Sequence, residues 1–200
     1  MNDPDKNVVS ELLASAKRAF LEEGFEGAAL RKICSDAGVT TGAVYFFFHS
    51  KEELFDALVK STVEETKRLC DKLAADELET LSLGVENDKK LITFLYTRRE
   101  EIRLLTEKSK GTKYEHYKDD LLQWLQNAFL RFFEAYYTGE IDHELIRILA
   151  EMRLKSYLEI INGEYDMKRM LDLSEKIGLY ADGGFSRLLQ TNNLMAKSRC

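Results

Sequence analysis

The sequence predicts an all-α fold, and three observations support this prediction. The 200-residue chain contains a single proline, Pro4, so little in it would interrupt a helix. It is rich in Leu, Glu, Lys, Ala and Arg, which are strong helix formers. Apolar residues recur at intervals of three and four, as they do on one face of a helix. These spacings predict about nine helices, with no internal repeat and no low-complexity segment.

The first helices are short and are joined by a tight turn. Residues 7–23 predict an amphipathic helix that ends at Gly24. Residues 28–37 predict a shorter helix, and Gly38 follows it in the position favoured for a left-handed cap. A third helix begins about two residues later. Two short helices joined by a glycine-containing turn of three or four residues are typical of a helix-turn-helix.

The third helix carries four consecutive aromatic residues, Tyr45–Phe48, in a chain that is otherwise strongly charged. At about 100° per residue, Val44 and Phe48 lie on one stripe, which we expect to be buried. Tyr45 and Phe46 fall on the far side of the helix and Phe47 is marginal. A helix buries only one stripe, so at least one ring must point outward. Core packing of the whole run is the alternative explanation.

A fourth helix starts with the sequence Ser50-Lys51-Glu52-Glu53, which fits a capping box in which Ser50 caps the helix and Glu53 reaches back. This helix is expected to end near Ala74. Its N-terminus presents free amides beside Lys51, an arrangement suited to a phosphate. After a polar break over residues 75–85, the pattern predicts helices at residues 86–97, 98–108, 114–137, 141–162 and 165–192.

Composition excludes several classes of protein. The formal net charge of −6 disfavours an indiscriminate nucleic-acid binder. No apolar run is long enough to span a membrane and the first residues do not resemble a signal peptide, so we expect a cytoplasmic protein with no membrane partner. Three widely spaced cysteines suggest buried thiols, with a redox sensor as the alternative. No catalytic motif or metal-ligand spacing is present, so we expect no enzyme activity, no catalytic or metal-binding residue and no cofactor.

The residues from Arg31 to Leu54 closely resemble the DNA-binding domain of the TetR family of transcriptional regulators. The resemblance rests on Arg31-Lys32-Ile33, on the run AGVTTGAVYFFF that begins at Ala37, and on the SKEEL sequence that begins at Ser50. It implies a helix-turn-helix DNA-binding domain over residues 1–50, joined by a long fourth helix to a ligand-binding and dimerisation domain over residues 51–200.

The resemblance also implies a set of DNA-binding residues: Arg31, Lys32, Thr40, Thr41, Gly42, Tyr45, Phe46, Phe47 and Lys51. Two departures from the family pattern weaken the expected phosphate contacts. Ala28-Ala29-Leu30 stands where the family commonly has a threonine, and Phe46 and Phe47 cannot donate a hydrogen bond. We therefore expect fewer phosphate contacts and a shallower salt dependence of DNA binding than in a strongly basic relative.

The C-terminal region is rich in aromatic residues, with fourteen beyond Val85. The family resemblance implies a ligand cavity there, and Phe94, Trp124, Phe133 and Tyr136 are candidate walls for a flat or apolar small molecule. Ordinary core packing is the alternative for each ring. The last two helices have two apolar faces or small residues, which suits the dimer interface that the family implies. The candidate interface residues are Leu145, Ile148, Met152, Tyr157, Ala181, Gly184 and Leu188.

These observations predict a homodimeric regulator, most simply a repressor that binds a palindromic operator and is released by a small-molecule effector. The same DNA-binding domain could serve an activator. A different class of function also remains open, namely a protein-interaction module that keeps the fold without binding DNA. It is motivated by the acidic balance of residues 1–60, which carry seven basic and ten acidic side chains. A regulator without any ligand is a third possibility.

Overall fold

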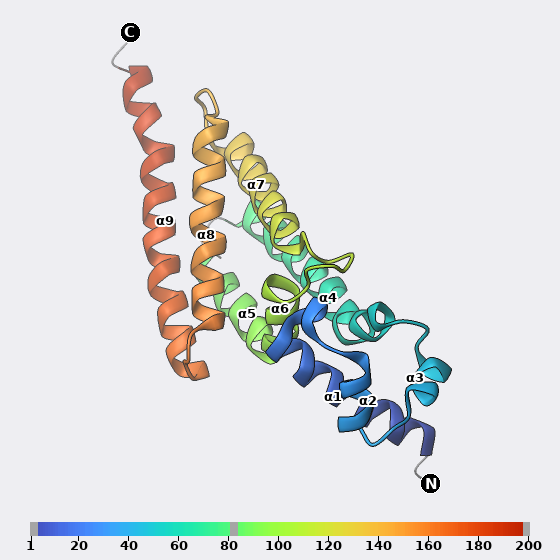
Figure 1. Cartoon of the computed structure of the whole chain (residues 1–200). Coiled ribbons are helices and arrows are strands. Elements are labelled where there is room, and N and C mark those ends of the chain that lie inside the picture. Colours follow the sequence, from blue (N-terminus) through green and yellow to red (C-terminus); the bar gives the residue numbers. More distant parts are fainter. Residues whose placement is uncertain (1–3, 81–83, 198–200) are drawn as a thin grey trace. The chain divides into compact units, whose positions relative to one another are not determined.

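The computed structural model describes residues 4–80 and 84–197, and these ranges contain helices and no strands. The predicted all-α class is therefore confirmed (Figure 1). The helices in the described ranges are α1 (Pro4–Gly27), α2 (Leu30–Asp36), α3 (Thr41–Phe47), α4 (Lys51–Glu79), α5 (Gly84–Thr97), α6 (Arg99–Glu107), α7 (Tyr117–Tyr136), α8 (His143–Asn162) and α9 (Met167–Lys197). None of these helices is long and apolar enough to cross a membrane.

The chain forms two compact units. Unit 1 consists of the chain up to Thr66 together with Glu100–Lys118, and unit 2 consists of Lys67–Arg99 together with the chain from Asp119 onward. Helix α4 therefore begins in unit 1 and ends in unit 2. The predicted domain boundary at residue 50 separates the helix-turn-helix from the rest of the chain by expected function, and it does not coincide with the boundaries of the two compact units. It stays a prediction.

Unit 1 is built around three phenylalanine rings. The ring centroid of Phe20 lies 5.7 Å from that of Phe25 and 5.3 Å from that of Phe55, and the Phe25 and Phe55 centroids are 5.6 Å apart. These separations are those of favourable aromatic pairs. The Ser15 hydroxyl donates to the carbonyl of Ile33 at 3.0 Å and so ties α1 to α2. The core thus fixes α1, α2 and the start of α4 against one another.

Several helix ends differ from the prediction by one turn or less, and the causes are local. Gly24 adopts φ +74°, the break that the sequence predicts, yet helical residues continue to Gly27. Helix α7 begins at Tyr117 instead of residue 114. The Ser109 hydroxyl donates to the carbonyl of Tyr114, while the Thr112 hydroxyl donates to the carbonyl of Ser109 and accepts from the N–H of Tyr114. These bonds hold the residues before Tyr117 in turns. Asp142 caps α8, accepting from two backbone N–H groups at 2.9 and 3.1 Å.

In unit 2, α5 packs against α9 with α8 beside both, and Leu125 of α7 forms a buried hydrophobic cluster with Ala150 and Leu154 of α8. Figure 1 shows α8 and α9 running side by side. Gly178 permits the close approach of α9 to α5, since a Cβ atom there would lie 2.8 Å from a carboxylate oxygen of Asp88 and 3.2 Å from Cγ2 of Val85. Gly183 and Gly184 have no such neighbours. Of the small residues near the centre of α9, Gly178 is the one whose lack of a side chain this packing requires.

Candidate functional site

Helix α3 presents aromatic side chains outward from a buried anchor. Val44 is 1% exposed, whereas Tyr45 is 52% and Phe46 is 77% exposed. The predicted orientation of these three residues is confirmed. Phe48, which was expected to be core, is only partly buried because it lies just after the last residue of α3. An exposed ring is costly in water, so the outward face of α3 is a candidate contact surface.

The residues around this face are small or hydroxylated. Thr40, Thr41 and Gly42 are exposed, and a Cβ atom at Gly42 would meet only the Thr40 hydroxyl, at 3.9 Å. The preceding turn contains Gly38 with φ +68°, a left-handed conformation that favours glycine. The start of α3 can therefore approach a surface closely, with hydroxyls available as hydrogen-bonding groups.

The predicted basic residues of this region have different surroundings. Arg31 and Lys32 are exposed on the first turn of α2, and the Lys32 ammonium pairs with Glu23 at 2.7 Å. The Lys51 ammonium points inward: it donates to the carbonyls of Phe25 at 2.6 Å and Ala28 at 3.0 Å. It also lies 4.4 Å from the centroid of the Phe25 ring. Lys51 therefore ties α4 to the end of α1, a structural role that sequence reasoning missed, and its phosphate contact stays a prediction.

The predicted capping box at the start of α4 is present. The Ser50 hydroxyl accepts from the N–H of Glu53 at 3.1 Å. The Glu53 carboxylate accepts from the N–H of His49 at 2.8 Å, one residue before the cap. These bonds satisfy amides that a helix start leaves unpaired, and they fix the position at which α4 follows α3.

A loop contact adds a second anchor near this helix start. Asp56 accepts a hydrogen bond from the Tyr114 hydroxyl at 2.5 Å and pairs with Lys113 at 2.6 Å. Partial burial opposes ionisation of Asp56, but the hydrogen bonds from Lys113 and Tyr114 outweigh it and lower its pKa. The first turns of α4 are thus fastened to residues 113 and 114 within unit 1.

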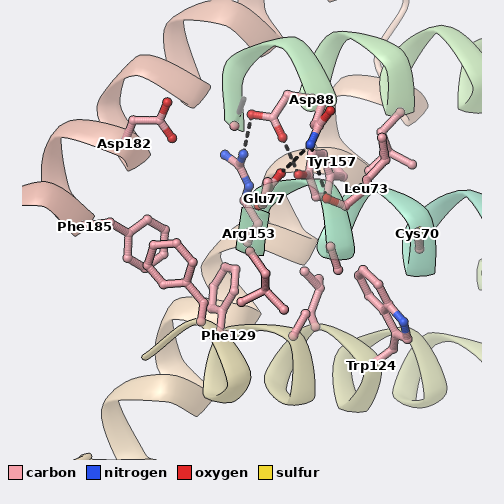
Figure 2. A pocket seen from close by; sticks show the side chains of 18 of the residues that line it. Cys70, Leu73, Glu77, Asp88, Trp124, Phe129, Arg153, Tyr157, Asp182 and Phe185 are labelled. Atoms are coloured by element: carbon pink, nitrogen blue, oxygen red, sulfur yellow. Dashed lines mark hydrogen bonds and ion pairs between the residues drawn. The ribbon is translucent and has the colours of Figure 1, made fainter. Parts of the chain in front are cut away.

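Unit 2 contains a cavity of about 170 Å³. Helices α4, α5, α7, α8 and α9 all contribute to its wall. One side is apolar and aromatic, and Figure 2 shows Trp124 and Phe129 projecting into it from α7. The rings that line the cavity are Trp124, Phe129, Phe132 and Phe185, and the aliphatic residues include Leu73, Leu91, Leu125 and Leu189.

The opposite side of the cavity carries a cluster of polar and charged side chains, defined here as the polar cluster. Its members are Glu77, Asn87, Asp88, Arg153, Tyr157 and Asp182. The Asp88 carboxylate accepts a hydrogen bond from Arg153 and another, at 2.6 Å, from the Tyr157 hydroxyl (Figure 2). The Asn87 amide donates to Glu77 at 3.3 Å and to the carbonyl of Leu73 at 3.2 Å.

The three carboxyl groups of the polar cluster resist ionisation. Burial raises the pKa of Asp88, although Arg153 and Tyr157 counteract this. Burial also raises the pKa of Glu77, and the nearby charge of Asp88 adds to the effect. The pKa of Asp182 is raised by burial and then by Asp88. The cluster therefore holds more negative charge than its one guanidinium balances.

The predicted wall residues are only partly those of the observed cavity. Trp124 lines it, with its indole N–H donating to Asp71 at 2.9 Å. Phe94, Phe133 and Tyr136 do not line it. Phe133 is 3% exposed and packs against other rings, and the Tyr136 hydroxyl donates to the carbonyl of Leu78. Trp124, Ala128 and Phe132 all line the cavity and follow one another at intervals of four residues on α7. This spacing places them on one face of the helix, and it is the sequence signal that could have identified Phe132.

The candidate interface residues differ in how exposed they are. Ile148 is 41% and Met152 is 52% exposed on α8. On α9, Leu179 at 60% and Tyr180 at 73% are exposed too, and the sequence prediction missed both. Tyr157 requires a correction: its hydroxyl bonds to Asp88 inside the cavity, so it belongs to the polar cluster and not to an outer face. Leu145, Ala181 and Leu188 are partly buried and Gly184 is exposed, and their role stays a prediction.

The two cysteines that the structure describes are buried and unpaired, as the first of the two interpretations expected. Cys70 lines the cavity, and burial, followed by the charge of Asp71, raises its pKa to about 12. It is therefore a protonated, weakly reactive thiol at neutral pH. Cys200 lies outside the described residues.

Comparison with known proteins matches the region that contains α2, α3 and the exposed rings to a protein family. Residues 12–58 match the family described as bacterial regulatory proteins, tetR family. The repressor AcnR of Corynebacterium diphtheriae is 29% identical over 175 residues, covering 83% of this chain and 88% of that protein. The chain is therefore similar to TetR-family regulators over its N-terminal segment and, at lower identity, over most of its length. AcnR of Corynebacterium efficiens is 32% identical over 98 residues, which cover 49% of this chain and only half, 50%, of that relative's length.

The similarity in fold to a solved structure extends over most of the chain. NalD, the secondary repressor of the MexAB-OprM multidrug efflux pump in Pseudomonas aeruginosa, superposes with a TM-score of 0.59 at 20% identity. That match covers 88% of this chain and 95% of NalD. At such low identity the likeness establishes the fold alone, so the roles of individual residues must come from the geometry described above.

Proposed function

We propose that this protein is a homodimeric transcriptional repressor that binds a palindromic operator through α3 and is released by a small molecule bound in the unit 2 cavity. The observation that carries the proposal is the exposure of Tyr45 and Phe46 above the buried Val44, within the segment that matches the family. This role requires no catalytic group. Because such a regulator acts on the chromosome, we also propose a cytoplasmic location.

The outward face of α3 suits the major groove of DNA. Gly42 and the hydroxyls of Thr40 and Thr41 allow the start of the helix to approach base edges and phosphates closely. The rings of Tyr45 and Phe46 can pack against thymine methyl groups. Arg31 is exposed and can reach a guanine or a phosphate. Base contacts of this kind specify sequence without requiring a strongly basic protein.

The exposed apolar residues of α8 and α9 support the dimer. Ile148 and Met152 are one turn apart on α8, and Leu179 and Tyr180 are exposed on α9. Large apolar side chains that are exposed on neighbouring helices are stabilised when a second copy of the chain covers them. A twofold dimer presents two recognition helices, which matches the two half-sites of a palindrome.

Helix α4 offers a route from effector to DNA. Its first residues carry the capping box and Lys51, and its later residues from Cys70 to Leu78 line the cavity. An effector that binds one arrangement of α4 more tightly than another shifts the population toward that arrangement. We propose that the favoured arrangement changes the separation of the two recognition helices and so releases the operator.

The decisive test is selection of random duplex DNA on the purified protein, followed by fluorescence anisotropy on the enriched sequence. We expect an enriched palindrome and a loss of about five- to 150-fold in affinity for Tyr45→Ala, because a specific base contact contributes about 1–3 kcal/mol. Tyr165→Ala is the matched control, since Tyr165 is 40% exposed but lies in unit 2. Size-exclusion chromatography should show the same dimer for all three proteins.

A protein-interaction module is the second candidate, and one observation favours it. Two of the predicted cationic DNA contacts are already engaged within the protein, Lys32 by Glu23 and Lys51 by backbone carbonyls. If selection enriches no sequence and the residual binding disappears at moderate salt, the regulator proposal fails and this candidate replaces it.

A further inference from the structure

We propose that the effector of this protein is an organic cation with an aromatic or apolar body, its positive group seated against Glu77 and Asp182. The inference rests on the proposed function, in which the unit 2 cavity is the effector site. It specifies the charge of the ligand, which the sequence left open as any flat or apolar small molecule.

The charge balance of the polar cluster carries the argument. It contains three carboxyl groups, Glu77, Asp88 and Asp182, and one guanidinium, Arg153. Arg153 pairs with Asp88 and lies 5.0 Å from the centroid of the Tyr157 ring. The charge of Arg153 also lowers the pKa of Glu77 and Asp182, but burial outweighs this and both pKa values stay raised. Within the described part of the chain, neither Glu77 nor Asp182 has an ion-pair partner: Glu77 accepts from the Asn87 amide, and Asp182 from the backbone of Val85. The lining of the cavity therefore carries three carboxyl groups and one cationic side chain, and Lys90, which donates to the Asn87 amide oxygen at 3.3 Å, does not line the cavity.

A ligand cation would supply what the protein does not. The raised pKa values of Glu77 and Asp182 indicate that each carboxylate is penalised by burial and by its neighbours. A cation placed between them removes part of this penalty, whereas an anionic ligand would add to it. A neutral ligand brings no charge and therefore does not relieve it. The cavity thus favours cationic ligands over neutral ligands, and neutral ligands over anionic ones.

The rest of the lining restricts the cation to an organic one. No group of three or more described His, Cys, Asp or Glu residues is placed to hold a metal ion. Trp124, Phe129, Phe132 and Phe185 instead offer ring faces and edges on the opposite side of the cavity. Such rings pack against a flat apolar body, and their faces attract an ammonium or similar group. An apolar body with a positive end matches both sides.

Trp124 provides a direct readout, because it is the only tryptophan of the chain and it lines the cavity. We would titrate the full-length protein with three ligands that share a benzyl group: benzyltrimethylammonium, its uncharged isostere neopentylbenzene, and the anion 3-phenylpropanoate. Tryptophan fluorescence reports binding of each. We expect the cation to bind at least about tenfold more tightly than the neutral isostere, and the anion to bind most weakly.

Paired variants assign the preference to the named carboxylates. The double variant Glu77→Gln, Asp182→Asn should reduce the preference for the cation over its neutral isostere to about threefold or less. Glu164→Gln is the surface control, since it removes one exposed carboxylate outside the cavity, and it should leave the preference unchanged. Equal or tighter binding of the neutral ligand, an unchanged preference in the double variant, or no response to any of the three ligands would overturn the inference.

Proton release provides an independent check. Binding of a cation lowers the raised pKa values of the carboxyl groups, so protons are released and cation affinity rises with pH. The titratable or charged groups that face the site are Cys70 and Glu77 from α4, Asp88 from α5, Arg153 and Tyr157 from α8, and Asp182 from α9.

Operator binding, measured in the absence of ligand, distinguishes failure of this inference from failure of the proposed function. Intact operator binding without cation preference refutes this inference alone, whereas absent operator binding refutes the proposed function.

Discussion

Replacement of Arg153 by methionine tests whether the buried ion pair of unit 2 holds the cavity together. The Asp88 side chain is 4% and the Arg153 side chain 12% exposed, so the variant leaves a buried carboxyl group beside Glu77 and Asp182. Methionine preserves most of the aliphatic length of the side chain while removing the charge. The expected effect is therefore electrostatic, with little change in packing.

The size of the effect follows from the ways in which Asp88 can respond. An uncompensated buried charge costs about 3–5 kcal/mol. Protonation of Asp88 limits that cost, because neutralising a carboxyl with an unfolded-state pKa of about 3.9 costs about 4 kcal/mol at pH 7 and about 1.5 kcal/mol at pH 5. In the variant the folded-state pKa of Asp88 is raised further above the unfolded value, so stability is lost as pH rises above about 4. The variant should therefore lose about 3–4 kcal/mol at pH 7 and much less at pH 5.

Urea unfolding followed by circular dichroism at both pH values measures this loss. The double variant Asp88→Asn, Arg153→Met should recover most of the stability at pH 7, because it removes the unpaired charge along with its partner. An equal loss at pH 5 and pH 7, or a double variant that is no more stable than Arg153→Met, would refute the electrostatic explanation and point to lost packing instead.

Three further predictions concern the helices around the cavity. Gly178→Ala should destabilise the protein by about 1–3 kcal/mol because its Cβ atom would collide with Asp88 and Val85, whereas Gly183→Ala, which meets no atom within 4 Å, should be neutral or stabilising in thermal unfolding. Met152→Glu should weaken the dimer by at least about tenfold in sedimentation equilibrium, since it places a charge on the exposed apolar face of α8; an unchanged dimer would remove that face from the interface. Glu77→Gln should raise the melting temperature at pH 7 but not near pH 4, because a raised folded-state pKa makes the ionised carboxylate destabilising only above its unfolded-state value.

The sequence by itself determined the features that depend on neighbours along the chain. The spacing of apolar residues predicted the helices, and the turn at Gly38 predicted the helix-turn-helix. The angular positions of Val44, Tyr45 and Phe46 within one helix predicted which is buried and which are exposed, as observed. The capping box at Ser50 was readable because its partners lie within four residues. Short-range geometry leaves few alternatives in each case.

The tertiary structure alone decided which faces of different helices meet. Asp88 and Arg153 are 65 residues apart, and nothing local marks them as partners. Phe133 and Tyr136 lie on the same helix as Trp124, yet only Trp124 lines the cavity. Tyr157 turned inward to Asp88, and Lys51 turned toward the backbone of α1. A helix with apolar residues on two sides can bury either, and the choice is made by the shape and charge of the helices packed against it. The polar cluster, and with it the charge of the proposed effector, could therefore be identified only from the folded chain.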